Sequence, residues 1–273
     1  MSKIQELESI SKQIRKDIVS MVNKAGSGHP GGSLSATDVM TALYFDVANI
    51  DPSNPENPNR DRIIYSKAHV TPLIYSLLAR KGFFDPKELD TFRKFKSNLQ
   101  GHPHIKCLPG IESSGGSLGQ GISLGIGHIL GSRITGKDFR VYVLIGDGEC
   151  QAGQIWESAM AAAHYQTDKL IAILDYNKYQ EMGPISREMA VEPFVDKWHS
   201  FGWHTTEVDG HDIMAITNSL QELQTIKEKP SILIAHTIKG KGISFVEKDY
   251  TWHGRAIKDD EQYKQAEKEI QCS

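Results

Sequence analysis

Residues 141–179 form a pattern of apolar runs and polar turns that constrains the fold more than any other part of the chain. One apolar run, residues 141–145, stops at Gly146-Asp147-Gly148, and a second, residues 170–174, stops at Asp175-Tyr176-Asn177. An Ala-rich segment of helical length separates the two runs. Two wholly apolar strands joined by a helix are typical of a βαβ unit, whose parallel strands are covered on both faces. The pattern therefore predicts an α/β protein with a parallel sheet.

Strands and helices alternate along the rest of the chain, which predicts a doubly wound, mostly parallel sheet with helices on both faces. Further strands are predicted at residues 62–66, 203–208 and 231–236. Helices are predicted at residues 4–25, at 36–47 behind a cap by Ser35, at 71–80, from Asp85, within 115–131, and at 192–201 and 212–223. Residues 27–33 hold too many glycines for a helix and are expected to form a loop. We expect one domain over residues 1–273, ending in a polar tail at residues 258–273, of which residues 258–271 form either a surface helix or a frayed end.

Charge and cysteine content exclude several classes of partner. The net charge of −3 is modest, and no basic tract is present, so we expect neither nucleic acid nor a membrane surface as a partner. The three cysteines are irregularly spaced, which argues against a structural disulfide or zinc site and favours a reducing compartment. Because the N-terminus lacks a signal-peptide pattern and no apolar run could span a bilayer, we expect a cytoplasmic protein.

The two polar turns of residues 141–179 predict a site for a hard cation. In open parallel sheets ligands bind at the carboxyl edge, where Asp147 and Asn177 would lie side by side. A carboxylate, an amide carbonyl and a main-chain carbonyl from the turn after Asn177 leave room for phosphate oxygens around Mg²⁺ or Ca²⁺. Gly148 and Glu149 begin the next helix, whose free N–H groups suit a diphosphate. The alternative is an ordinary βα turn in which Asp147 caps the helix.

Four histidines stand in turn-like contexts, and such side chains can transfer protons or hydrogen-bond a substrate near neutral pH. They are His29, His69, His102 and His253. The alternative interpretation of His29 is an incidental histidine in a flexible connector. No dinucleotide fingerprint or phosphate-binding loop is present, because the GxGxxxG spacing within residues 115–131 misses the fingerprint by one residue and no strand precedes it. A plain nucleotide-binding α/β domain would leave these histidines unexplained.

Taken together, the motifs resemble the N-terminal half of transketolase, a thiamine diphosphate-dependent enzyme. The matching motifs are Ser27-Gly28-His29-Pro30-Gly31-Gly32, Ser66-Lys67-Ala68-His69, Gly101-His102-Pro103, Gly119-Gln120-Gly121, Gly146-Asp147-Gly148 with Asn177, Val208-Asp209-Gly210-His211-Asp212 and Trp252-His253-Gly254. They cover nearly the whole chain in order. Full-length transketolases continue with a pyrimidine-binding domain and a C-terminal domain, so the length resembles the N-terminal subunit of a split transketolase.

The resemblance implies a thiamine diphosphate-binding fold and a set of site residues. Asp147, Asn177 and the carbonyl of Tyr179 would hold Mg²⁺ or Ca²⁺. The residues implied to meet the cofactor are His69, Gly116, Leu118, Gly148, Glu149, Asn177 and His253, with Gly116 and Leu118 beside the aminopyrimidine. The histidines His29, His69, His102 and His253 would line the channel where a ketose phosphate donates its two-carbon unit.

The resemblance also implies a partner chain. In the family a glutamate of the pyrimidine-binding domain activates the cofactor, and that domain is missing here. We therefore expect an obligate complex with a C-terminal transketolase subunit that carries the pyrimidine-binding and C-terminal domains, with two copies of each chain. Sugar phosphates of the pentose phosphate pathway would be the substrates.

Two positions depart from the family pattern. Ala152 stands where the family usually has a glutamate that contacts the activating glutamate of the partner. An alanine could simply favour the start of the helix, but its presence predicts retained cofactor binding with impaired or uncoupled catalysis. A regulatory, non-catalytic subunit is one alternative, and 1-deoxyxylulose-5-phosphate synthase or dihydroxyacetone synthase is another. The milder departure is Ala68, where glycine commonly precedes the histidine.

Overall fold

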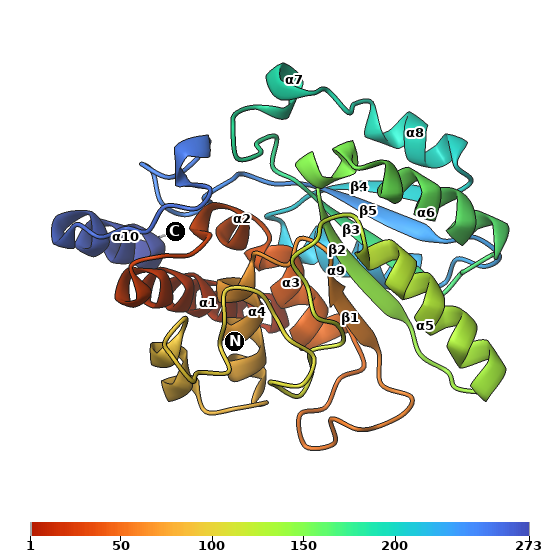
Figure 1. The fold of residues 1–273 in the computed structure, drawn as a ribbon, viewed down its shortest axis with the longest axis horizontal. Coiled ribbons are helices and arrows are strands. Elements are labelled where there is room, and N and C mark those ends of the chain that lie inside the picture. Colours follow the sequence, from red (N-terminus) through yellow and green to blue (C-terminus); the bar gives the residue numbers. More distant parts are fainter. Residues whose placement is uncertain (1, 273) are drawn as a thin grey trace.

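A parallel β-sheet forms the centre of the computed structural model, which describes residues 2–272 (Figure 1). Its strands are β1 (Arg62–Tyr65), β2 (Val141–Gly146), β3 (Leu170–Tyr176), β4 (His204–Asp209) and β5 (Ser231–His236). Their order in the sheet is β1-β2-β3-β5-β4, and every neighbouring pair is parallel. Because the pairing sets Gly146 beside Asp175 and Asp175 beside Ala235, the strands end at one common edge. The predicted parallel sheet is confirmed.

Helices cover both faces of the sheet (Figure 1). The α-helices are α1 (Lys3–Ala25), α2 (Pro30–Ser35), α3 (Thr37–Ala42), α4 (Thr71–Lys81), α5 (Gly121–Thr135), α6 (Gly153–His164), α7 (Ile185–Glu188), α8 (Phe194–Ser200), α9 (Ile213–Leu223) and α10 (Asp260–Cys272). A π-helical turn, Leu43–Val47, continues α3, and 3₁₀ turns occur at Pro86–Thr91, Gly148–Gln151 and Tyr250–Trp252.

The inner strands β2, β3 and β5 alternate side chains between two cores, which is why their sequences are largely apolar, whereas the edge strand β4 is mostly polar. In β2, Tyr142 and Leu144 pack in the core with α1, α3, α4 and α9. Val141, Val143 and Ile145 point to the opposite core, with α5, α6 and α8. The doubly wound arrangement therefore follows from the apolar runs, as predicted.

The chain ends in a helix that is anchored to the first one. Residues 258–273 are expected to be a polar tail, but α10 within them buries Ala266 and Ile270 in the core that includes α1 (Figure 1). Its other side chains are largely polar and exposed, as the composition predicts. Within residues 2–272, no helix combines the length and apolarity needed to cross a lipid bilayer.

The prediction was wrong at residues 30–35, although residues 27–29 form a loop as expected. We expected a glycine-rich loop, but α2 begins at Pro30 and includes Gly31 and Gly32. The reason is tertiary packing: a Cβ atom on Gly31 would lie 3.1 Å from Cε of Lys239 and 3.2 Å from the carbonyl oxygen of Trp252. The glycines therefore serve close approach rather than loop flexibility. Ser35 is the last residue of α2 and makes no cap; its hydroxyl instead donates to Asp175 at 2.6 Å.

Candidate functional site

The carboxyl edge of the sheet carries a cavity of about 390 Å³. It is formed by the segments that follow four neighbouring strands, which contribute Lys67 and His69 after β1, Asp147 after β2, Asn177 after β3 and Lys239 after β5. The predicted site residues that line it are His29, His69, Gly116, Leu118, Asp147, Gly148, Glu149, Asn177, Tyr179 and His253. The structure thus brings together, in one cavity, residues from along most of the chain.

His102 is the predicted site residue that does not line this cavity. It is exposed, and its ring lies beside the loop that contains Gly116, where a Cβ atom would be 3.7 Å from Cδ2 of the histidine. Since Gly116 does line the cavity, His102 stands at its rim.

The oxygen-bearing side chains of Asp147 and Asn177 both line the cavity. Asp147 is buried, and its carboxylate accepts hydrogen bonds from the backbone N–H groups of Gly148, at 2.7 Å, and Lys178. The amide of Asn177 donates to Asp175 at 3.1 Å, which leaves its carbonyl oxygen to accept from the backbone N–H of Tyr179 at 3.1 Å. Among residues 2–272, no three His, Cys, Asp or Glu side chains gather as a metal site. A site here would instead combine one carboxylate with neutral oxygens, which suits a hard cation.

The electrostatics around these two side chains fit a cation. Burial, followed by the charge of Asp175, raises the pKa of Asp147 to about 7. A buried carboxylate of this kind is stabilised by a nearby positive charge. The ammonium group of Lys239 already donates to the carbonyl oxygens of Tyr179 and Gln180, at 3.3 Å and 3.2 Å. Burial and the charge of Lys67 lower the pKa of Lys239 to about 8, so this cation is itself poorly solvated.

Three histidine rings pack against one another in the cavity. The ring centroids of His29, His69 and His253 lie 5.1–5.4 Å apart. Burial lowers the pKa of His29 to about 4 and that of His253 to about 3, and it lowers the pKa of His69 well below the usual value. The three rings are therefore neutral at neutral pH. Nδ1 of His29 is buried without a hydrogen-bond partner among residues 2–272, which fits a polar ligand in this cavity.

A buried ion pair lies beneath the cavity. The carboxylate of Asp175 accepts hydrogen bonds from Lys67, Ser35, Thr237 and Asn177. Burial alone would raise the pKa of Asp175, but the Lys67 ammonium and these hydrogen bonds lower it overall. The network therefore keeps Asp175 charged and fixes the amide of Asn177.

Sequence reasoning assigned no role to Lys67, Asp175 or Lys239, although each stands at or shortly after the end of a predicted strand. Lys67 lies two residues after the end of β1, and Lys239 lies in the segment after β5. The rule that polar residues at strand ends meet at one edge applied to them as well. That rule was the signal that could have identified them.

The family to which these residues belong follows from comparison with known proteins. The model of the family described as "Transketolase, thiamine diphosphate binding domain" matches residues 7–270. The chain belongs to this transketolase family. The resemblance inferred from the motifs is thereby confirmed.

Relatives of similar length are subunits of transketolases. The chain is 40% identical over 267 residues to a subunit of the apulose-4-phosphate transketolase of Phocaeicola vulgatus, covering 98% of this chain and 94% of the relative. It is also 40% identical to the SqwG subunit of the 6-deoxy-6-sulfo-D-fructose transketolase of Clostridium sp. strain MSTE9, covering 97% and 96%. The chain therefore matches these subunits over nearly their full length.

Solved transketolase structures share the fold. The transketolase of Pichia stipitis in complex with sedoheptulose 7-phosphate superposes with a TM-score of 0.91 at 30% identity. The match covers 97% of this chain but 40% of that one. The predicted α/β fold of the transketolase diphosphate-binding domain is confirmed.

Two family positions near the cavity have clear structural settings. The carboxylate of Glu149 accepts hydrogen bonds from Ser66 and from the backbone N–H groups of Gly119, at 2.7 Å, and Gly146, at 2.9 Å. The Glu149 side chain therefore supports the loop that contains Gly119. The backbone N–H group of Glu149 remains the part suited to a diphosphate. Ala68 is fully buried and is accommodated because Gly115 faces it, where a Cβ atom would lie 2.2 Å from that of Ala68.

Ala152 lies outside the cavity, next to the first turn of α6. It precedes the helix in an extended conformation and makes no capping hydrogen bond. Alanine is a poor residue at this position, so the suggestion that it favours the helix start does not explain its presence. Its Cβ atom instead lies 3.2 Å from where a Cβ on Gly119 would be.

Proposed function

We propose that this chain is the N-terminal subunit of a two-chain transketolase. The enzyme transfers a two-carbon ketol unit from a ketose phosphate to an aldose phosphate in the cytoplasm, within the pentose phosphate pathway. The proposal rests on the cavity, which is lined by Asp147, Asn177, Tyr179 and three histidines, in a chain that matches subunit relatives over 94–96% of their length.

The proposed cofactor is thiamine diphosphate with Mg²⁺ or Ca²⁺. Asp147, Asn177 and the carbonyl of Tyr179 would hold the metal, supported by the buried carboxylate and the neutral oxygens around it. The proposed contacts to the cofactor are His69, Gly116, Leu118, Gly148, the backbone of Glu149, Asn177 and His253. When bound, the cofactor supplies a carbon nucleophile and an electron sink.

The side chains of this chain would bind and orient the substrate and the cofactor. Because the cavity histidines are neutral at neutral pH, each can both donate and accept hydrogen bonds to sugar hydroxyl groups. We assign this role to His29, His69 and His253, and we propose His102, at the rim of the cavity beside Gly116, as a further contact to the substrate. Lys67 and Lys239 place positive charge on the cavity wall, where it would attract a diphosphate.

The proposed partner is a C-terminal subunit with the pyrimidine-binding and C-terminal domains, two copies of each chain forming a heterotetramer. The support is the subunit naming of the relatives and the 40% coverage of a transketolase from Pichia stipitis. The partner would supply the activating glutamate that the resemblance implies.

The deciding experiment is an assay of ketol transfer from xylulose 5-phosphate to ribose 5-phosphate with thiamine diphosphate and Mg²⁺. We expect turnover by this chain mixed with its partner chain and none by either chain alone. Robust turnover by the isolated chain would contradict the proposal.

The same assay decides between an active subunit and an impaired or regulatory one. The alanine at position 152 favours the impaired or regulatory subunit. Ala152→Glu in the complex should raise turnover while leaving cofactor affinity unchanged, because Ala152 does not line the cavity. Equal turnover of the two complexes would show that this position causes no deficit.

Binding of Mg²⁺ should weaken as the pH falls below about 7. The metal binds the ionised carboxylate of Asp147, whose pKa is raised from 3.8 to about 7 chiefly by burial. Protons therefore compete with the metal, and the affinity falls about tenfold for each pH unit below that value. Because the folded-state pKa lies above that of the unfolded chain, ionisation lowers the stability of the metal-free protein as the pH rises between these two values.

Thermal denaturation with and without Mg²⁺ and thiamine diphosphate measures this effect. The stabilisation by the two ligands should be larger at a pH one unit above 7 than at a pH one unit below it. A stabilisation that is equal at both pH values, or larger at the lower one, would show that Asp147 does not titrate as the metal ligand.

A further inference from the structure

The turn after β4 clamps the segment that carries Lys239. The backbone N–H of Gly210 donates to the carbonyl of His236 at 2.9 Å. A Cβ atom on Gly210 would lie 2.4 Å from Cγ2 of Thr237, so only glycine permits this approach. The segment that follows β5 therefore begins in contact with the β4 turn.

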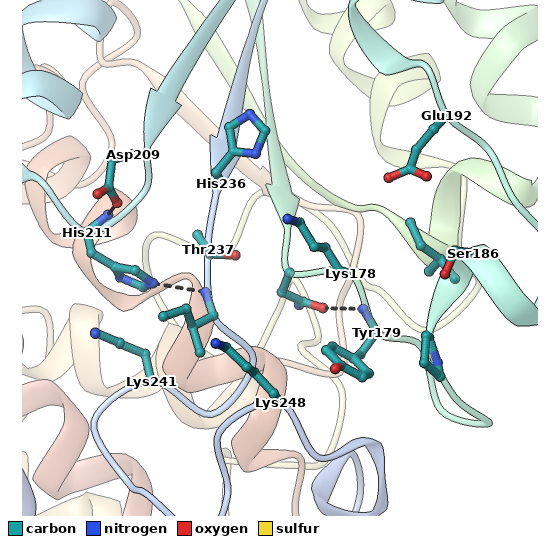
Figure 2. Close-up of a pocket in the computed structure, with 14 residues that line it drawn as sticks. Lys178, Tyr179, Ser186, Glu192, Asp209, His211, His236, Thr237, Lys241 and Lys248 are labelled. Atoms are coloured by element: carbon teal, nitrogen blue, oxygen red, sulfur yellow. Dashed lines mark hydrogen bonds between the residues drawn. The ribbon is translucent and has the colours of Figure 1, made fainter.

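His211 extends the clamp by one residue. Its Nε2 accepts a hydrogen bond from the backbone N–H of Ile238 at 2.9 Å (Figure 2), and its Nδ1 lies 2.8 Å from Asp38. Burial would raise the pKa of Asp38, but the Arg15 guanidinium and His211 hold it well below its usual range. Asp38 is therefore an acceptor, so Nδ1 carries the proton and Nε2 presents its lone pair to Ile238. The partners on both sides select the same neutral tautomer.

Asp38 is itself firmly anchored. The guanidinium of Arg15 binds it through two hydrogen bonds, of 2.9 Å and 2.6 Å, and Ser11 donates to it at 2.7 Å. Both the Arg15 and Asp38 side chains are about 7% exposed. A buried chain of hydrogen bonds thus runs from α1 through α3 and the β4 turn to Ile238, the residue before Lys239.

Lys239 needs such support. It lies in residues 237–242, which form no regular helix or strand and include two glycines of positive φ, Gly240 and Gly242. Its side chain is only 1% exposed, and both burial and the charge of Lys67 disfavour an ammonium group there. A second cavity, of about 870 Å³, is lined by Thr237, Ile238 and Lys241 (Figure 2). Lys239 instead lines the cavity of about 390 Å³ that is proposed to hold the cofactor, the cofactor cavity. The hydrogen bond at Ile238 thus fixes the backbone directly before the lysine, whose ammonium group donates to the carbonyls of Tyr179 and Gln180.

We propose that His211 is a positioning residue, which holds the amide of Ile238 so that the ammonium group of Lys239 stays in the cofactor cavity. This inference rests on the proposed function, because it gives Lys239 its importance for an anionic, metal-bound cofactor. His211 acts through the lysine and contacts no substrate itself.

A double-mutant cycle on the full chain tests the proposal, with thiamine diphosphate and Mg²⁺ as the probe in calorimetric titration. His211→Asn keeps a donor for Asp38 but is too short to accept from Ile238, and it should weaken binding about tenfold, as outer-shell substitutions do. His211→Gln, the matched control, retains a donor and an acceptor and should bind nearly as wild type. In a Lys239→Gln background, His211→Asn should change affinity less than about twofold.

Equal effects of His211→Asn with and without Lys239 would overturn the positioning role, since a structural role would weaken binding in both backgrounds. Thermal denaturation of each variant without ligand shows whether folding is retained. If His211→Asn does not fold, His211→Leu, which also removes the acceptor for the Ile238 amide but keeps the bulk of the side chain, takes its place in both backgrounds with the same expected results. Failure of the wild-type chain to bind the probe, alone and with its partner, would overturn the proposed function and this inference together. Binding by the wild type with additive effects would overturn this inference alone.

Discussion

Asp147→Asn should abolish Mg²⁺-dependent binding of thiamine diphosphate and lower ketol transfer by the complex at least about a hundredfold. The other proposed ligands, Asn177 and the carbonyl of Tyr179, are neutral oxygens, so Asp147 supplies the negative charge of the donor set. An asparagine keeps the size and one acceptor but loses that charge. By the proposed ligand set, the divalent ion would then have no anionic protein ligand and would bind far more weakly.

Calorimetric titration and the ketol-transfer assay measure this loss, and metal-free stability separates it from misfolding. Because burial raises the pKa of Asp147, its ionised form is unfavourable in the folded protein, and the neutral asparagine should leave the metal-free chain at least as stable at neutral pH. Asp138→Asn is the control, since the Asp138 side chain is 82% exposed and pairs with Lys169 at the surface. Retained Mg²⁺ dependence in Asp147→Asn would show that the metal binds elsewhere.

Lys67→Met should lower the free energy of unfolding by about 3–5 kcal/mol. The side chains of Lys67 and Asp175 are 4% and 1% exposed, and the substitution leaves the buried carboxylate without its cation. Three further hydrogen-bond donors remain on Asp175, but none carries a charge. Urea denaturation measures the change.

A second lysine–aspartate pair provides the matched control for Lys67→Met. Lys169 and Asp138 also form an ion pair, but their side chains are 35% and 82% exposed. Lys169→Met should therefore change the free energy of unfolding by less than about 1 kcal/mol. Similar losses in the two variants would show that burial of the Lys67 pair has no particular importance.

The sheet could be predicted because its determinants are local. The inner strands β2, β3 and β5 each contain an apolar run bounded by polar residues. Such runs are recognisable without knowledge of their neighbours. The same holds for Asp147 and Asn177, because a residue directly after a parallel strand must lie at the carboxyl edge. These parts of the site followed from the chain read in order.

The remaining parts depend on contacts between distant segments. The need for glycine at position 31 is explained by Lys239 and Trp252, more than two hundred residues later. The partners of Asp175 depend on β5 lying beside β3, with β4 outside it, and a single sequence does not reveal that order. The neutral state of the cavity histidines likewise results from burial, which spacing does not indicate.

The hydrogen bonds to Asp175 join α2, the turn after β1, the end of β3 and the segment after β5. If any one of these segments has not docked, the Asp175 carboxylate lacks one of its hydrogen-bond donors. The cavity then also lacks the residues that this segment contributes. Cofactor affinity is therefore a property of the finished fold and is absent from partly folded forms. In practice, the fraction of a preparation that binds the cofactor measures the fraction of correctly folded molecules. The immobilised cofactor could therefore be used to purify them.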